Sequence, residues 1–263
     1  MKSSKPTAIM SVLIPTILLL TTSPTVLAEE DEVEFGAAVM IIELTEEDIE
    51  LQVFADAFDW KRIEITDPND RRVFVARARG KLRRQGGMSE MFWASEPSHF
   101  LEEEDNFDEP IEAFLDRWPE GDYEFEASTG TGVEIEGEAT LSHVLAALPE
   151  IVSPVSDTED PPVVDPNNVL VIDWEPVTTR FIGDGPVEIF EYQVILDQVD
   201  PEREMAWVDG NTRRALINLP PTVTELTVSP EFLLPGTSYE FEVLAIEASG
   251  NSTISVGEFD TSE

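Results

Sequence analysis

The sequence has 263 residues, no cysteine, and 55 acidic against 16 basic residues, a formal net charge of −39. A chain without cysteine has no disulfides and no lipid attached at a cysteine, so its stability must come from apolar cores. The strong negative charge is expected to repel nucleic acid and anionic lipid. Two interpretations of this charge stay open: solubility in a salty environment, which is favoured, and binding of divalent cations, for which no EF-hand spacing is present.

The first 28 residues have the layout of a secretory signal peptide. Lys2 and Lys5 form a positive start, residues 8–20 form an apolar run, and residues 26–28 form a small-residue cleavage site. An uncleaved anchor is the alternative, although the apolar run is short for a membrane span. We therefore expect a secreted protein, periplasmic or extracellular, that begins near Glu29 and has no membrane span after the signal is removed.

The next part of the chain alternates in the manner of strands. Residues 39–44 and 49–54 are predicted as two strands, and residues 60–65 as a third. Residues 67–70, with the sequence Asp-Pro-Asn-Asp, predict a hairpin turn after the third strand. The sequence therefore predicts that the first half of the chain is built mainly of antiparallel strands.

A basic segment follows the hairpin turn, and we predict it as a strand over residues 73–83 with small and apolar residues on one face. Its other face carries Arg77, Arg79, Lys81 and Arg83. One interpretation is a docking stripe for an anionic polymer or a lipid head group. The favoured interpretation is cross-strand pairing with the outward acidic rows of residues 122–126 and 134–138, because nearby acids would cancel the positive field.

Aromatic residues of the first half suggest a second kind of surface. A strand over residues 89–95 carries Trp93, and a short helix over residues 110–118 ends at Trp118. Exposed tryptophans at these two positions would form stacking platforms for a sugar, which makes a carbohydrate-binding accessory module the alternative function. A core position is favoured for Trp93, because large aromatic rings are usually buried.

One short pattern occurs twice in the chain. A proline is followed four residues later by a tyrosine that begins a strand, and the tyrosine hydroxyl can then bond to the backbone upstream and close the corner of a sandwich. The repeated residues are Pro119 and Pro235, Tyr123 and Tyr239, and Phe125 and Phe241, each pair separated by 116 positions. The repeat predicts an all-β fold of two tandem antiparallel β-sandwiches, with a short helix in the first.

The second half carries further landmarks in order along the chain. Trp174 precedes Glu-Pro, Tyr192 lies in a strand, Leu226 lies in a later strand, and residues 234–243 form the second corner. Over roughly residues 150–261 the chain resembles a fibronectin type III domain. The resemblance implies a seven-stranded sandwich that serves as a spacer or interaction module.

In that resemblance Trp174 is the core residue of the second strand, Tyr192 is the core residue of the third, and Tyr239 is the corner. The adhesion tripeptide Arg-Gly-Asp of some members is absent, and the loop 248–252 in the equivalent place carries no charge. Adhesion of the integrin type is therefore not implied.

Signals of catalysis are absent from the sequence. His99 and His143 lie in different contexts, and no nucleophile elbow, phosphate-binding loop or dinucleotide fingerprint is present. Asn251-Ser-Thr matches a glycosylation acceptor. We expect no enzyme, no cofactor and no metal site, and a hydrolase is the least supported alternative.

These observations divide the chain into a signal peptide at residues 1–28, an N-terminal β-sandwich at 32–148, and a fibronectin type III-like domain at 149–261. The proline-rich residues 149–168 form the connection. The predicted function is a secreted, non-catalytic recognition or spacer module whose partner is an unknown protein or polysaccharide at the cell exterior.

Overall fold

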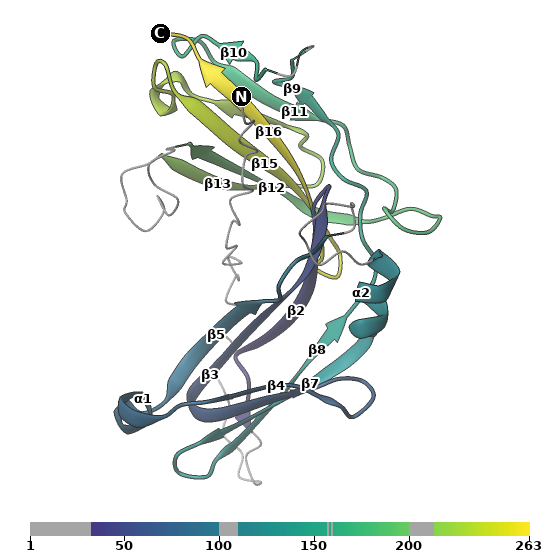
Figure 1. The fold of residues 1–263 in the computed structure, drawn as a ribbon, viewed down its shortest axis with the longest axis vertical. Coiled ribbons are helices and arrows are strands. Elements are labelled where there is room, and N and C mark those ends of the chain that lie inside the picture. The colour runs from purple at the N-terminus through teal and green to yellow at the C-terminus, as the bar shows by residue number, and fades with distance from the viewer. Residues whose placement is uncertain (1–32, 100–109, 157, 159, 200–212) are drawn as a thin grey trace, which may run out of the picture.

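The computed structural model describes residues 33–99, 110–156, 158, 160–199 and 213–263, so the predicted signal peptide lies outside the described residues. Strands dominate these residues, which confirms the all-β prediction. Two lobes are joined near the ends of β2 and β16 (Figure 1). The elements of the first lobe are β1 (Val33–Glu34), β2 (Ala37–Leu44), β3 (Asp48–Thr66), β4 (Arg72–Arg77), α1 (Gly80–Gln85), β5 (Met88–Ala94), β6 (Ser98–His99), α2 (Ile111–Arg117), β7 (Gly121–Thr129) and β8 (Glu134–Leu141).

The second lobe follows the proline-rich connection, which itself contributes two short strands. Among its described residues it also contains one turn of 3-10 helix, η1 (Pro230–Phe232). Its strands are β9 (Ile151–Ser153), β10 (Val163–Val164), β11 (Leu170–Trp174), β12 (Ile189–Gln198), β13 (Arg214–Leu219), β14 (Glu225–Val228), β15 (Ser238–Glu247) and β16 (Ser252–Thr261).

Strand β3 replaces the two separate strands that the sequence predicted over residues 49–54 and 60–65. The ladder register shifts between Asp56 and Trp60, and Asp59 has a φ of 49°. This bulge bends one continuous strand instead of ending it. The first part of β3 pairs with β2 and β5, and the last part pairs with β4 and β7. One strand therefore runs through both layers around the first core, which includes Leu51 and Phe125.

Each lobe contains a sheet with the same strand order. The first lobe has β1-β8-β7-β3-β4 and the second has β10-β16-β15-β12-β13. In both sheets the edge strand is parallel to its neighbour: β1 pairs in parallel with β8, and β10 pairs in parallel with β16. The long ladders are antiparallel, as predicted, and a third short pairing, of β16 with β2, is parallel like these two.

The second lobe closes its sandwich with a separate sheet in the order β14-β11-β9. Three strands thus face a sheet whose antiparallel part is β13-β12-β15-β16, the arrangement of a fibronectin type III domain. Trp174 on β11 and Tyr192 on β12 lie in the core between the sheets, with ring centroids 5.4 Å apart. Leu145 packs in the first core and the next residue, Ala146, packs in the second, so the two cores are adjacent in the chain.

Candidate interaction surface and the junction that positions it

The basic segment is not the continuous strand that the sequence predicted. Strand β4 ends at Arg77, and the chain then turns into α1 at Gly80, which has a φ of 56°. Pairing ends there because the partner strand β3 is bulged around Asp59 and offers no regular ladder to continue. The residues Lys-Leu-Arg-Arg-Gln that follow all favour a helix.

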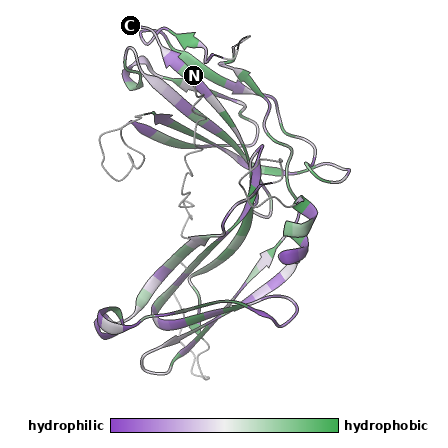
Figure 2. Ribbon diagram, in the orientation of Figure 1, coloured by the Kyte–Doolittle hydropathy of each residue, from purple (hydrophilic) through white to green (hydrophobic). Residues whose placement is uncertain are grey.

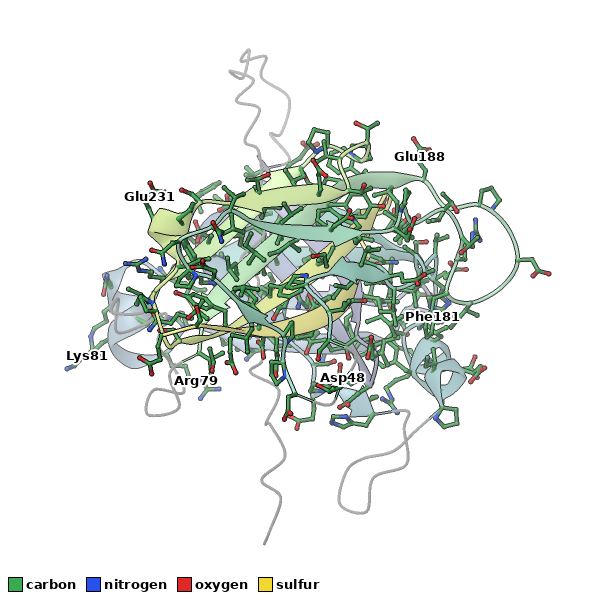
Figure 3. The ribbon with its side chains drawn as sticks, turned by 90° about the horizontal axis from the view of Figure 1, so that it is seen from above. Asp48, Arg79, Lys81, Phe181, Glu188 and Glu231 are labelled. Carbon is green, nitrogen blue, oxygen red and sulfur yellow. The ribbon has the colours of Figure 1, made fainter. Side chains whose placement is uncertain are left out.

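This departure places the basic side chains around a short helix at the far end of the first lobe. Five basic side chains lie there, and all of them are exposed. In the part of the chain that the structure describes, none of the five makes a side-chain hydrogen bond or an ion pair. Figure 2 shows α1 as a hydrophilic end of the lobe, and Figure 3 shows two of these side chains at the rim. They are Arg77, Arg79, Lys81, Arg83 and Arg84.

The favoured pairing of these residues with the acidic rows was wrong. The rows oppose one another instead: Glu124 lies opposite Glu138, and Glu126 lies opposite Glu136. In the first lobe, Glu64 of β3 forms ion pairs with Arg62 and Arg72. The exposed basic residues around α1 are therefore available to another molecule.

Two large apolar side chains lie at the same end of the lobe. Phe58 in the bulge of β3 is 52% exposed, and Leu82 in α1 is 41% exposed. The segment after α1 is pressed against the bulge, since a Cβ on Gly87 would lie 2.4 Å from the carbonyl oxygen of Trp60. This contact holds α1 beside the bulge. We call Phe58, Arg77, Arg79, Lys81, Leu82, Arg83 and Arg84 the basic tip.

Trp93 was predicted as a candidate contact residue, but the structure places it away from the basic tip. It lies near the end of β5, whereas α1 precedes the start of β5. Its ring stacks on Phe74 at 5.2 Å and lies 6.5 Å from Trp118 with an interplanar angle of 45°. The two tryptophans are half-buried and packed together, so they do not form the coplanar exposed pair that a sugar platform requires.

The two corner tyrosines are buried, and each hydroxyl bonds to backbone upstream. Tyr123 donates to the carbonyl of Pro119 at 3.1 Å. Tyr239 accepts from the amide of Leu234 at 2.8 Å and donates to the carbonyl of Phe232 at 3.4 Å.

The other predicted structural residues lie around these corners. Pro235 is exposed in the second corner, and Leu226 on β14 packs against the second core, opposite Ile172 of β11. Burial raises the pKa of Tyr192, whose hydroxyl also accepts a hydrogen bond from the amide of Val177 at 2.8 Å.

The basic tip is held relative to the second lobe by a hydrogen-bonded junction. Ser252 and Thr253 of β16 pair in parallel with Glu43 and Leu44 of β2, so the sheet continues from one lobe into the other. The Thr253 hydroxyl also donates to the carbonyl of Ala147 at 3.2 Å.

Asn251 is the residue of this junction that sequence reasoning missed. Its side-chain oxygen accepts from the amide of Ile42 at 2.8 Å, and its side-chain nitrogen donates to the carbonyls of Ser142 at 2.8 Å and Val144 at 2.9 Å. The residue is 2% exposed, so the acceptor motif Asn251-Ser-Thr does not present its amide for glycosylation in this fold. The sequence signal for this residue was the pair Gly250-Asn251, which is typical of a turn. In the structure Gly250 has a φ of 98°.

Carboxylates crowd the same junction. Glu43 is 8% exposed and lies directly opposite Glu50 in the pairing of β2 with β3. Burial raises the pKa of Glu43 well above its ordinary value, and the charges of Glu50 and Glu242 raise it further. Burial also raises the pKa of Glu50, and the hydrogen bond that Gln52 donates to Glu50 at 2.8 Å offsets part of that rise. The junction is therefore destabilised when these carboxyls ionise.

Metal-binding side chains do not cluster among the described residues. No group of three or more histidine, aspartate and glutamate side chains there is placed to hold a metal ion. One open hollow is lined in part by exposed glutamates of β1, β7 and β8. A buried carboxyl that could act as general acid is missing from that lining. No described helix is long and apolar enough to span a bilayer.

Comparisons with known proteins give matches among solved structures only. No protein-family model and no curated protein matches the sequence. Among solved structures, the FN1–FN3 domains of chicken CNTN1 match at 10% identity, with a TM-score of 0.36, over 88% of this chain and 67% of that one. By its own strand order, the second lobe has a fibronectin type III-like fold.

Two further solved structures are also similar to the chain. A segment of two fibronectin type III domains from chicken tenascin matches at 13% identity, with a TM-score of 0.29, over 84% of this chain and 97% of that one. A structure concerning host cell surface retention of a bacterial ice-binding adhesin matches at 11% identity, with a TM-score of 0.27, over 89% of this chain and 66% of that one. Similarity at this level concerns the fold alone.

Proposed function

We propose that the protein is a secreted, non-catalytic spacer and recognition module, in which the junction between the two lobes holds the basic tip of the first lobe at a fixed distance from the second. The observation that carries this proposal is the side chain of Asn251, which bonds to three backbone groups of the first lobe. A flexible linker would leave the lobes free to rotate. Here the sheet itself crosses the junction.

The packing of the tryptophans gives no support to the carbohydrate-binding alternative, because Trp93 and Trp118 pack on each other at a tilt. The hydrolase alternative has no supporting constellation among the described side chains. Recognition therefore rests on the exposed basic tip, and the second lobe and the junction serve to position it.

Distance measurement between spin labels tests the fixed arrangement. The chain has no cysteine, so cysteines introduced at the exposed positions Gln85 and Thr222 are labelled without interference. We expect a narrow distance distribution between the lobes, as narrow as that of a control pair within the second lobe at Thr222 and Val256. A broad distribution between the lobes beside a narrow control would refute the spacer proposal.

A further inference from the structure

The basic tip combines two properties that a lipid surface would match. We propose that it docks the protein onto anionic lipid headgroups, with its basic side chains among the headgroup phosphates and Phe58 and Leu82 entering the interface. This inference goes beyond the spacer function, since it depends on the composition of the tip and not on the junction.

The charge of the tip is concentrated, and the exposed Asp59 of the β3 bulge lies beside it, next to Gly86. Residues 75–88 contain five basic residues and no acidic one, in a chain with 55 acidic residues. None of the five basic side chains forms an ion pair within the described structure. A lysine or arginine close to an anionic membrane surface strengthens binding by about fivefold. Several such residues together should therefore bind an anionic membrane surface much more strongly than one basic residue would.

The net charge of −39 does not cancel this attraction. At physiological salt, charges are screened over about 8 Å, so the tip responds mainly to what lies directly beside it. In Figure 1, α1 lies at the end of the first lobe remote from the second lobe, which keeps the acidic second lobe away from a surface that the tip contacts. The whole chain is thus repelled by anionic surfaces at long range, whereas the tip is attracted at contact.

The exposed apolar side chains decide in favour of lipid over an anionic polysaccharide. Phe58 and Leu82 are 52% and 41% exposed beside the basic residues. A polysaccharide would bind the charges but leave the ring and the leucine in water. A membrane places an apolar phase just beneath its charged layer, and basic surfaces with exposed Phe or Leu bind at that boundary.

Co-sedimentation with lipid vesicles tests the charge of the tip. The purified mature protein is mixed, at roughly 0.15 M salt, with phosphatidylcholine vesicles that either lack or contain about 30% phosphatidylglycerol. We expect binding to the anionic vesicles only. The pair Lys81→Gln and Arg83→Gln should weaken it by about 25-fold, at fivefold per charge. The control Arg71→Gln removes an exposed charge at the other end of β4 and should leave binding unchanged.

A second pair of variants tests the apolar contribution. Phe58→Ala with Leu82→Ala should weaken vesicle binding by about tenfold, since both side chains leave water on docking. The control Phe190→Ala changes a phenylalanine that is 66% exposed in the second lobe, and it should have no effect. All four replaced tip side chains are exposed, so these variants should fold and keep the spin-label distances of the wild type.

Three results would overturn the proposal. The first is equal binding to neutral vesicles, and the second is an equal loss of binding in Arg71→Gln. The third is full vesicle binding by the Phe58 and Leu82 variant together with displacement by soluble polygalacturonate, which would assign the tip to an anionic polysaccharide. Each of these leaves the spin-label test of the spacer function unaffected, so the two proposals fail independently.

Discussion

The side-chain oxygen of Asn251 in the second lobe accepts a hydrogen bond from the backbone amide of Ile42 in the first lobe, at 2.8 Å across 209 positions of sequence. The same side chain donates twice to the segment that follows β8. One amide therefore makes three of its four possible hydrogen bonds to the neighbouring lobe. The relationship makes Asn251 the residue on which the arrangement of the two lobes depends most directly.

Replacing Asn251 with alanine should destabilise the protein and loosen its junction. Three buried backbone groups lose their partner, at roughly 1 kcal/mol each, so we expect a loss of about 3 kcal/mol in the free energy of unfolding. Urea denaturation measures this loss, and the spin-label distribution between the lobes should broaden. Asn69→Ala, at an exposed turn position, is the control and should change neither quantity. An unchanged distance distribution in Asn251→Ala would show that the paired strands hold the lobes without it.

The buried carboxyl of Glu43 should make the protein more stable in mild acid. Its folded pKa is raised by burial and by Glu50 and Glu242, so the folded state binds its proton more tightly than the unfolded state. The stabilisation is fully present below the ordinary carboxyl pKa and is lost as pH rises through the raised value. Glu43→Gln removes this loss and should stabilise the protein at pH 7 by about 1 kcal/mol.

The measurement for Glu43→Gln is the free energy of unfolding at a series of pH values from mild acid to neutral. The slope should be smaller in the variant than in the wild type, and part of it should persist because burial also raises the pKa of Glu50 and of Glu240. Glu188→Gln, an exposed carboxyl, is the control and should keep the wild-type slope. A Glu43→Gln slope identical to wild type would contradict the assignment.

A methyl group at Gly257 should disturb the second core. Gly257 lies opposite Phe241 on the neighbouring strand, and a Cβ there would lie 2.3 Å from the end of the buried Phe241 ring. We expect Gly257→Ala to lower the free energy of unfolding by about 1–3 kcal/mol. Combining it with Phe241→Leu, which shortens the side chain, should cost less than the sum of the two single variants. Simple additivity would show that the ring is not what opposes the methyl group.

Added salt should raise the melting temperature. Once the predicted leader is removed, 14 basic residues face 55 acidic ones, and repulsion among the acids disfavours the compact state. Raising sodium chloride from low to molar concentration screens this repulsion, and we expect an increase on the order of 5 °C by thermal denaturation. A melting temperature that falls steadily over the same range would show that repulsion does not govern stability.

Gly137 and Gly257 show how far the resemblance between the two lobes extends. Gly137 lies opposite Phe125 on the neighbouring strand, as Gly257 lies opposite Phe241. In the first lobe the freed space is filled by Phe35, whose ring lies 5.9 Å from that of Phe125. The repeated corner seen in the sequence thus marks a repeated sheet, although the first lobe builds its opposite layer differently, through the bent strand β3.

By itself, the sequence determined the features that depend on near neighbours: which residues alternate into a core, where proline and tyrosine close a corner, and the sign of the charge. Tyr239 and Trp174 could be placed because period-two alternation reports the buried face of a strand. Only the tertiary structure decided that Arg79 and Lys81 leave the sheet, because that outcome depends on a bulge in β3 some twenty positions earlier in the chain. It also decided the role of Asn251, whose partner Ile42 is 209 positions away, a distance over which no local pattern carries information.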